Sequence, residues 1–148
     1  MKKGLALVLG ILSSIVPAVG MVGAADAQDL AIIVNQNNFE SLTKEEIRNI
    51  FTGKLTQYPN YQTHIVVAVS EDDKLRDYFN EKIIETSSRD LKKNWSRLIF
   101  TGKVDPPKVF NSTQEVIDYV ARHRNAIAYV PLETVTNDVR IAFIYSGG

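Results

Sequence analysis

The chain of 148 residues contains no cysteine. It therefore forms no disulfide and carries no lipid anchor on an N-terminal cysteine, so its fold depends on a hydrophobic core. Histidine is also scarce, because His64 and His123 are the only two. With no cysteine and no second histidine nearby, neither histidine indicates a metal site.

An excess of charge of either sign is also missing. Lysine and arginine together number 17, as do aspartate and glutamate, so the formal net charge is zero. The chain has no basic run and no basic stripe interleaved with aromatic residues. This composition argues against binding to nucleic acid or to an anionic membrane surface.

The long hydrophobic run of the chain lies at its N-terminus. Lys2 and Lys3 precede an apolar stretch over residues 4–22, and residues 25–27 (Ala-Asp-Ala) place small side chains where a signal peptidase reads. An uncleaved membrane anchor is the alternative, but the proline and glycines inside the stretch weaken it. The pattern predicts a signal peptide over residues 1–27, which is removed on export.

One exported unit is expected to remain after the signal is removed. Residues 28–148 suffice for one domain with a real core, but they are too few for a second full domain. They contain no linker and no low-complexity segment. We expect this domain to be soluble and periplasmic, because it has neither a lipid anchor nor a second long apolar run.

Hydrophobic periodicity divides the domain into alternating strands and helices. Apolar runs predict strands at residues 31–35, 64–69, 127–130 and 139–145. Caps followed by amphipathic stretches predict helices that begin near residues 44, 71, 88 and 112, and residues 104–110 are expected to form a loop. Because the strands are too apolar to face water, we expect an α/β fold, a three-layer αβα lobe with helices on both faces of a mixed sheet.

The pentapeptide IFTGK occurs twice, at residues 50–54 and 99–103. Each copy closes a helical stretch and places glycine where a helix C-terminus favours a positive φ. We expect Phe51 and Phe100 to pin the last turns of their helices to the core. Neither Gly-Lys pair fits a phosphate loop, which needs a glycine five residues earlier and Ser or Thr after the lysine. The repeat therefore predicts two helix ends, not a binding site.

Catalytic and metal chemistry have weak support in the sequence. The acidic residues 71–73 lack the alternating ligands of a calcium loop, and carboxylates are favoured at a helix N-terminus in any case. Ser70 lacks the flanking glycines of a nucleophile elbow. We therefore predict that the protein is not an enzyme, with no catalytic residue, no metal ligand and no cofactor.

The turn between the second strand and its helix is the best candidate for a ligand site. In open α/β sheets, ligands bind beyond the carboxyl ends of the strands, where helix amides favour anions. An ordinary strand–helix turn that binds nothing is the alternative. The candidate ligand-binding residues are Ser70, Asp73, Lys74 and Arg76.

Three segments carry a resemblance to a known family. Residues 42–60 (LTKEEIRNIFTGKLTQYPN), 95–107 (WSRLIFTGKVDPP) and 126–130 (AIAYV) resemble PstS-like phosphate ABC transporter substrate-binding proteins, in particular short exported members. The resemblance implies a type 2 periplasmic-binding-protein fold. Full members have two α/β lobes that close on phosphate and serve a membrane permease, whereas this chain resembles a single lobe.

The candidate turn departs from the pattern of that family. After the second strand the family usually has an arginine, two further residues, and Gly-Ser-Gly-Thr. The resemblance aligns Val69 with the arginine and residues 72–75 (Asp-Asp-Lys-Leu) with the glycine motif, and Arg76 matches a basic residue often found next. A guanidinium and a hydroxyl that suit an oxyanion are thus replaced, and two carboxylates stand where the anion would dock.

Two functions from different classes stay open on the sequence. In the first, the protein is a non-catalytic periplasmic solute-binding protein of the phosphate (oxyanion) ABC-transporter type. It would then bind phosphate or another small anion and serve an ABC permease. In the second, it is a periplasmic interaction or sensory accessory module that kept the fold and lost phosphate binding. Its partner would then be a sensor, a porin or a second copy in a homodimer.

Overall fold

The computed structural model describes residues 28–60 and 64–148, so the predicted signal peptide lies outside the described residues. Within these ranges, no helix is long and apolar enough to cross a lipid bilayer. The elements in chain order are β1 (Leu30–Asn35), α1 (Lys44–Phe51), β2 (Val66–Ser70), α2 (Asp73–Phe79), the π-helical turn η1 (Asn80–Ile84), α3 (Ser88–Phe100), β3 (Lys108–Phe110), α4 (Thr113–Arg122), β4 (Ala126–Pro131), the 3-10 turn η2 (Leu132–Thr134) and β5 (Val139–Tyr145).

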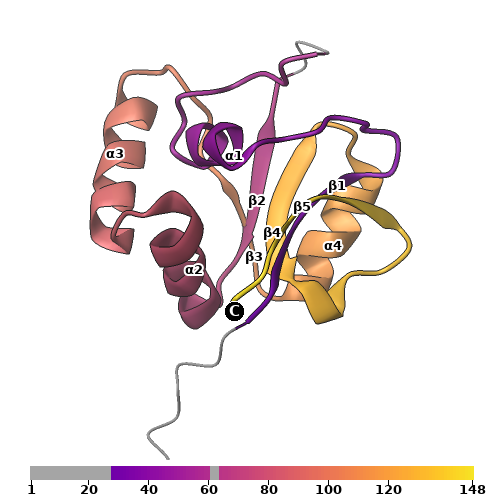
Figure 1. Cartoon of the computed structure of the whole chain (residues 1–148). Helices are drawn as coiled ribbons and strands as arrows, with labels where there is room; N and C mark the ends of the chain where they lie inside the picture. The colour runs from indigo at the N-terminus through magenta and orange to yellow at the C-terminus, as the bar shows by residue number, and fades with distance from the viewer. Residues whose placement is uncertain (1–27, 61–63) are drawn as a thin grey trace, which may run out of the picture.

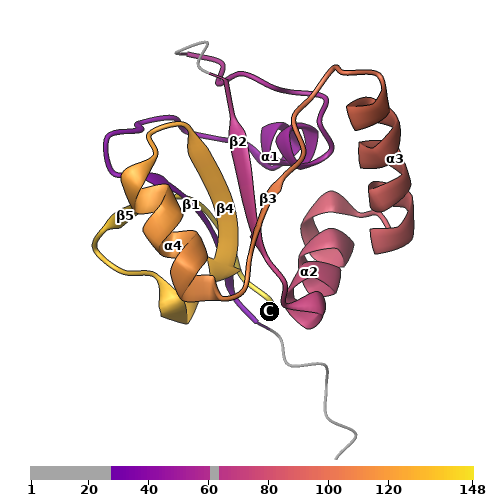
Figure 2. The same ribbon diagram turned by 180° about the vertical axis from the view of Figure 1, so that it is seen from behind.

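The five described strands form one mixed sheet in the order β3-β2-β4-β1-β5. β2 pairs in parallel with β3 and β4, whereas β1 pairs antiparallel with β4 and β5. Helices α1, α2 and α3 lie on one side of the sheet and α4 lies on the other (Figures 1 and 2). The predicted three-layer αβα arrangement is therefore confirmed.

The core consists of two apolar clusters, one on each face of the sheet. Because successive strand residues point to opposite faces, Ile32 belongs to the cluster under α1 and α2, and Ile33 belongs to the cluster under α4. In the first cluster the ring of Phe79 stacks on the ring of Tyr129, with the centroids 3.8 Å apart. Both faces of β1 are thus buried, which explains its continuous apolar sequence.

The first IFTGK copy ends α1 as the sequence predicts. Thr43 and Glu46 form a capping box at the start of the helix, near the predicted residue 44, and Phe51 is buried at its end. Gly53 has a φ of 76°, the left-handed conformation that glycine adopts without strain. A Cβ at this position would lie 2.7 Å from Cδ1 of Leu98, so glycine also lets α3 approach the end of α1.

The second IFTGK copy also ends a helix, but its phenylalanine does not reach the core. Gly102 has a φ of 69°, whereas Phe100 is 92% exposed, so the expectation that Phe100 pins α3 to the core is wrong. The side of α3 that carries Trp95 and Leu98 packs against Gly53. Phe100 follows Leu98 by two residues, which is roughly 200° around a helix of 3.6 residues per turn, so it points to solvent.

One strand was predicted as loop. Within the predicted loop 104–110, residues Lys108–Phe110 form the edge strand β3, which pairs in parallel with Ala68–Ser70 of β2. The strand begins directly after Pro106-Pro107, since proline has no amide hydrogen for a sheet. Three residues are too short for a periodicity signal, which is why sequence reasoning missed this strand.

Candidate functional site

The carboxyl ends of β2 and β3 form a topological switch point. The two strands are parallel neighbours, but the chain leaves β2 for α2 on one side of the sheet and leaves β3 for α4 on the other (Figures 1 and 2). In open α/β sheets, ligands usually bind at an edge where the connections diverge in this way. The predicted site residues follow β2 and therefore lie at this edge.

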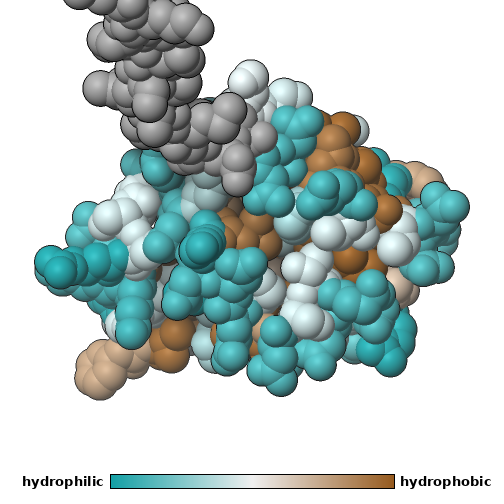
Figure 3. Space-filling model, turned by 90° about the horizontal axis from the view of Figure 1, so that it is seen from below, coloured by the Kyte–Doolittle hydropathy of each residue, from teal (hydrophilic) through white to brown (hydrophobic). Residues whose placement is uncertain are grey.

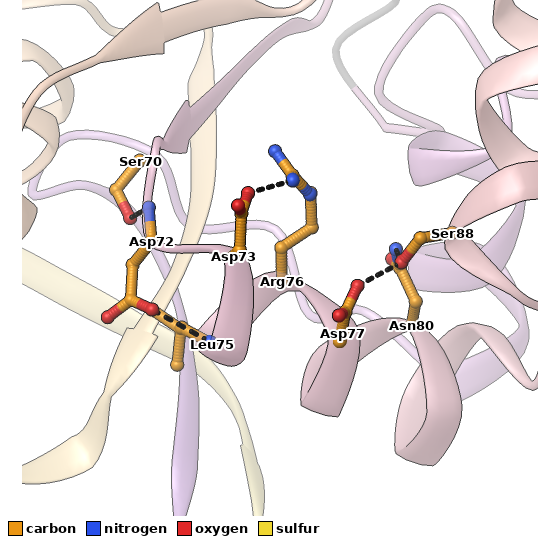
Figure 4. A network of polar contacts seen from close by, with 8 residues as sticks. All are labelled: Ser70, Asp72, Asp73, Leu75, Arg76, Asp77, Asn80 and Ser88. Atoms are coloured by element: carbon orange, nitrogen blue, oxygen red, sulfur yellow. Dashed lines mark hydrogen bonds and ion pairs between the residues drawn. The ribbon is translucent and has the colours of Figure 1, made fainter.

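Ser70 is the last residue of β2 and is 4% exposed. Its Oγ accepts a hydrogen bond of 3.3 Å from the amide of Asp72. The carboxylate of Asp72 in turn accepts a bond of 3.1 Å from the amide of Leu75 and caps α2 (Figure 4). The turn thus satisfies amides of the helix start with its own side chains.

The other three predicted site residues lie in α2. Arg76 donates to the carboxylate of Asp73, one turn earlier on the same helix (Figure 4). Lys74 is exposed and forms no ion pair within the part of the chain that the structure describes. The structure therefore brings Asp73 and Arg76 into contact, keeps Ser70 within the turn, and gives exposed Lys74 no ion-pair partner among the described residues.

The charge at this edge is negative on balance. Residues 71–73 carry three carboxylates, against the two cations Lys74 and Arg76. Asp77, one turn further on, accepts a hydrogen bond from Ser88 of α3 (Figure 4). Seen from the end toward which β2 points, the surface is mostly hydrophilic, with hydrophobic residues in separate patches (Figure 3).

The sequence analysis did not place the end of β3 and the start of α4 at this edge. The amide of Glu71 donates to the carbonyl of Phe110 over 2.9 Å, which ties the end of β2 to the end of β3. α4 starts directly beyond, where Ser112 accepts from the amide of Glu115 over 3.2 Å. The sequence indicated a helix start near residue 112, but without β3 nothing placed that start at the same edge as Ser70.

Metal chemistry has no support in the described residues. Within them, no group of three or more His, Cys, Asp or Glu side chains is arranged to hold a metal ion. Asp72 is engaged by a helix amide and Asp73 by Arg76, so the acidic run of residues 71–73 does not converge on one point.

Comparison with known proteins adds a family and a fold. Residues 27–147 match the family described as PBP superfamily domain. The comparison with curated proteins found no match. Several solved structures share the fold over most of the described chain.

Three of these structures carry names related to phosphate transport. A protein from Clostridium perfringens, described as a phosphate ABC transporter substrate-binding protein with bound phosphate, is 25% identical with a TM-score of 0.61; the match covers 78% of this chain and 45% of that one. An ABC-type phosphate transport receptor from Vibrio cholerae is 22% identical with a TM-score of 0.58, covering 78% and 46%. PstS from Borrelia burgdorferi is 14% identical with a TM-score of 0.57, covering 77% and 46%. The chain thus spans about half the length of these proteins.

Proposed function

The chain belongs to the PBP superfamily domain family, and on that premise we propose that it is a non-catalytic solute-binding domain of the phosphate (oxyanion) ABC-transporter type. The observation that carries the proposal is the likeness to the Clostridium perfringens protein, which is described with bound phosphate. The switch point between β2 and β3 supports it, because this is the edge at which such sheets hold ligands.

In the proposed site, Ser70, Lys74 and Arg76 donate hydrogen bonds to the oxyanion. Hydroxyl, ammonium and guanidinium groups all suit phosphate oxygens, and the cations give the stronger bonds. Asp73 takes the opposite role, since its carboxylate accepts the O–H that monohydrogen phosphate still carries at neutral pH. Glu71 and Asp72 oppose the charge of the anion, so the affinity is expected to be modest.

Calorimetric titration of the purified protein with phosphate tests this proposal. We expect saturable heat, and we expect Lys74→Ala to weaken binding by about 1 kcal/mol, or roughly fivefold, since it removes one solvated positive charge. Lys93→Ala is the matched control, because Lys93 is an exposed lysine on α3 away from this edge. Absence of heat at millimolar phosphate, or an equal loss in both variants, would contradict the proposed site.

Comparison of sulfate with phosphate tests the acceptor role of Asp73 separately from the donor role of the other site residues. It has no proton to donate to Asp73 at neutral pH, so sulfate is expected to bind more weakly than phosphate. Asp73→Asn is expected to remove this preference, since an amide can donate to either anion. A preference for phosphate that survives the substitution would show that Asp73 does not accept the ligand proton.

Export and partnership complete the proposal. We propose that residues 1–27 are a signal peptide, that residues 28–148 act as one exported lobe, and that the lobe delivers its ligand to an ABC permease. The intact mass of the protein recovered from the exported fraction is expected to correspond to a chain that begins at Gln28. Recovery of the full-length mass from membranes would instead indicate an uncleaved anchor.

A further inference from the structure

A groove of about 540 Å³ lies between α3 and the sheet, and Arg76 is the one proposed oxyanion-site residue that lines it. Its volume falls within the roughly 300–1,000 Å³ of small-molecule sites. Most of its wall is aliphatic or aromatic. Seven elements contribute, and the apolar side chains include Val67 and Val69 of β2, Phe79 of α2, Leu91 and Trp95 of α3, and Tyr129 of β4.

Hydrogen bonds tie down the wall of this groove that α3 forms. Trp95 donates from Nε1 to the carbonyl of Phe51 over 2.9 Å, and Asn94 donates to the carbonyl of Thr52 over 2.7 Å. At the start of α3, Asn80 donates to Oγ of Ser88 over 3.0 Å. These bonds tie α3 to the end of α1 and to η1, while no residue of this fully described helix is buried. The apolar wall is therefore preorganised and open to a ligand.

The charged side chains that line the groove are all positive. Arg76 of α2 and Arg89 and Lys92 of α3 all line it, and among the described residues no aspartate or glutamate does. Arg89 and Lys92 form no ion pair with any other described residue. The groove therefore differs in charge from the edge at the carboxyl ends of β2 and β3, where carboxylates outnumber cations.

We propose that this groove binds a small amphipathic carboxylate, such as a medium-chain fatty acid. The apolar body lies against the aliphatic and aromatic wall, and the carboxylate pairs with the cations, above all Arg89 and Lys92. Burial of the chain gains about 0.8 kcal/mol for each methylene, and guanidinium groups suit carboxylates. A bare oxyanion would leave the apolar wall in water, so the groove favours a different ligand, although Arg76 lines it as well as the proposed phosphate site.

Trp95 provides a built-in reporter, because it is the single tryptophan of the chain and lines the groove. Titration of the full exported protein with octanoate is expected to change tryptophan fluorescence in a saturable manner. Octan-1-ol and octylammonium have similar apolar bodies without the negative charge, so each is expected to bind at least about tenfold more weakly. Saturating phosphate is expected to weaken octanoate binding by no more than the contribution of Arg76, because Arg89 and Lys92 lie outside the proposed phosphate site.

Charge-matched variants test the role of the cations. The double substitution Arg89→Ala with Lys92→Ala is expected to weaken octanoate binding on the order of tenfold. The pair Lys93→Ala with Lys103→Ala removes the same charge from exposed positions outside the groove, and it is expected to leave binding unchanged. Equal effects of the two pairs would mean that only net charge matters and would overturn the assignment.

A substitution that fills the groove tests whether octanoate binds there. Val69→Phe adds volume to the groove floor, and it is expected to abolish octanoate binding while circular dichroism shows an intact fold. Phosphate binding by calorimetry should survive in this variant, which separates the two proposals. No fluorescence change with millimolar octanoate, equal affinity for octan-1-ol, or full binding in Val69→Phe would each overturn the inference.

Discussion

Replacement of Phe51 with alanine is expected to lower the free energy of unfolding by about 3–5 kcal/mol. The Phe51 ring is 3% exposed, and its centroid lies 4.8 Å from that of Phe79 and 5.7 Å from that of Tyr129. Truncation removes buried apolar surface and leaves a cavity beside this stacked pair of rings. Chemical denaturation followed by circular dichroism measures the change.

Phe100→Ala is the matched control, because the same side chain occupies the same place in the second IFTGK copy. Phe100 is 92% exposed, so its removal is expected to change the free energy of unfolding by no more than about 0.5 kcal/mol. Comparable losses in Phe51→Ala and Phe100→Ala would show that Phe100 packs against the core instead of facing solvent.

Replacement of Glu40 with alanine is expected to cost about 3 kcal/mol of folding free energy. Glu40 is fully buried, at 0% exposure, and its carboxylate accepts bonds of 2.9 and 2.7 Å from the amide and side chain of Asn60. Hydrogen bonds to a charged group contribute about 1.5–3 kcal/mol each. Asn60 is exposed, so water can hydrogen-bond to it when the carboxylate is removed. Each of the two bonds is therefore expected to contribute about 1.5 kcal/mol, the lower end of that range.

The comparison variants for Glu40 are Glu40→Gln and Glu45→Ala. Glutamine keeps one acceptor oxygen, so about half of the loss is expected. Glu45 is an exposed carboxylate in the first turn of α1, and its removal is expected to cost well under 1 kcal/mol. A Glu40→Ala protein as stable as Glu45→Ala in chemical denaturation would contradict a structural role for the buried carboxylate.

Much of the fold was predictable because local sequence and tertiary packing agree. The capping box of Thr43 and Glu46 and the continuous apolar run of β1 each indicate one element, and the structure confirms both. Phe51 and Phe100 show where this agreement ends. The two pentapeptides are identical and both end helices, yet burial depends on which side of the helix meets the sheet, which a five-residue motif does not specify.

The candidate sites were predictable only in part. The topological rule for strand ends pointed to the turn after β2, but it did not indicate that Asp72 caps α2 or that Asp73 pairs with Arg76. No local pattern in the sequence indicates the groove. In the sequence, Arg89 and Lys92 look like the solvated side of a helix, and only the position of α3 relative to β2 makes them part of an apolar hollow.

The position of β1 in the sheet governs when the molecule can fold. Residues 30–35 lie between β4 and β5, so this first strand has no sheet partners until residues 126–145 have been synthesised. Contacts of such long sequence separation form slowly. The delay suits the export proposed above, because a chain whose sheet has not closed stays extended until its last strand is available.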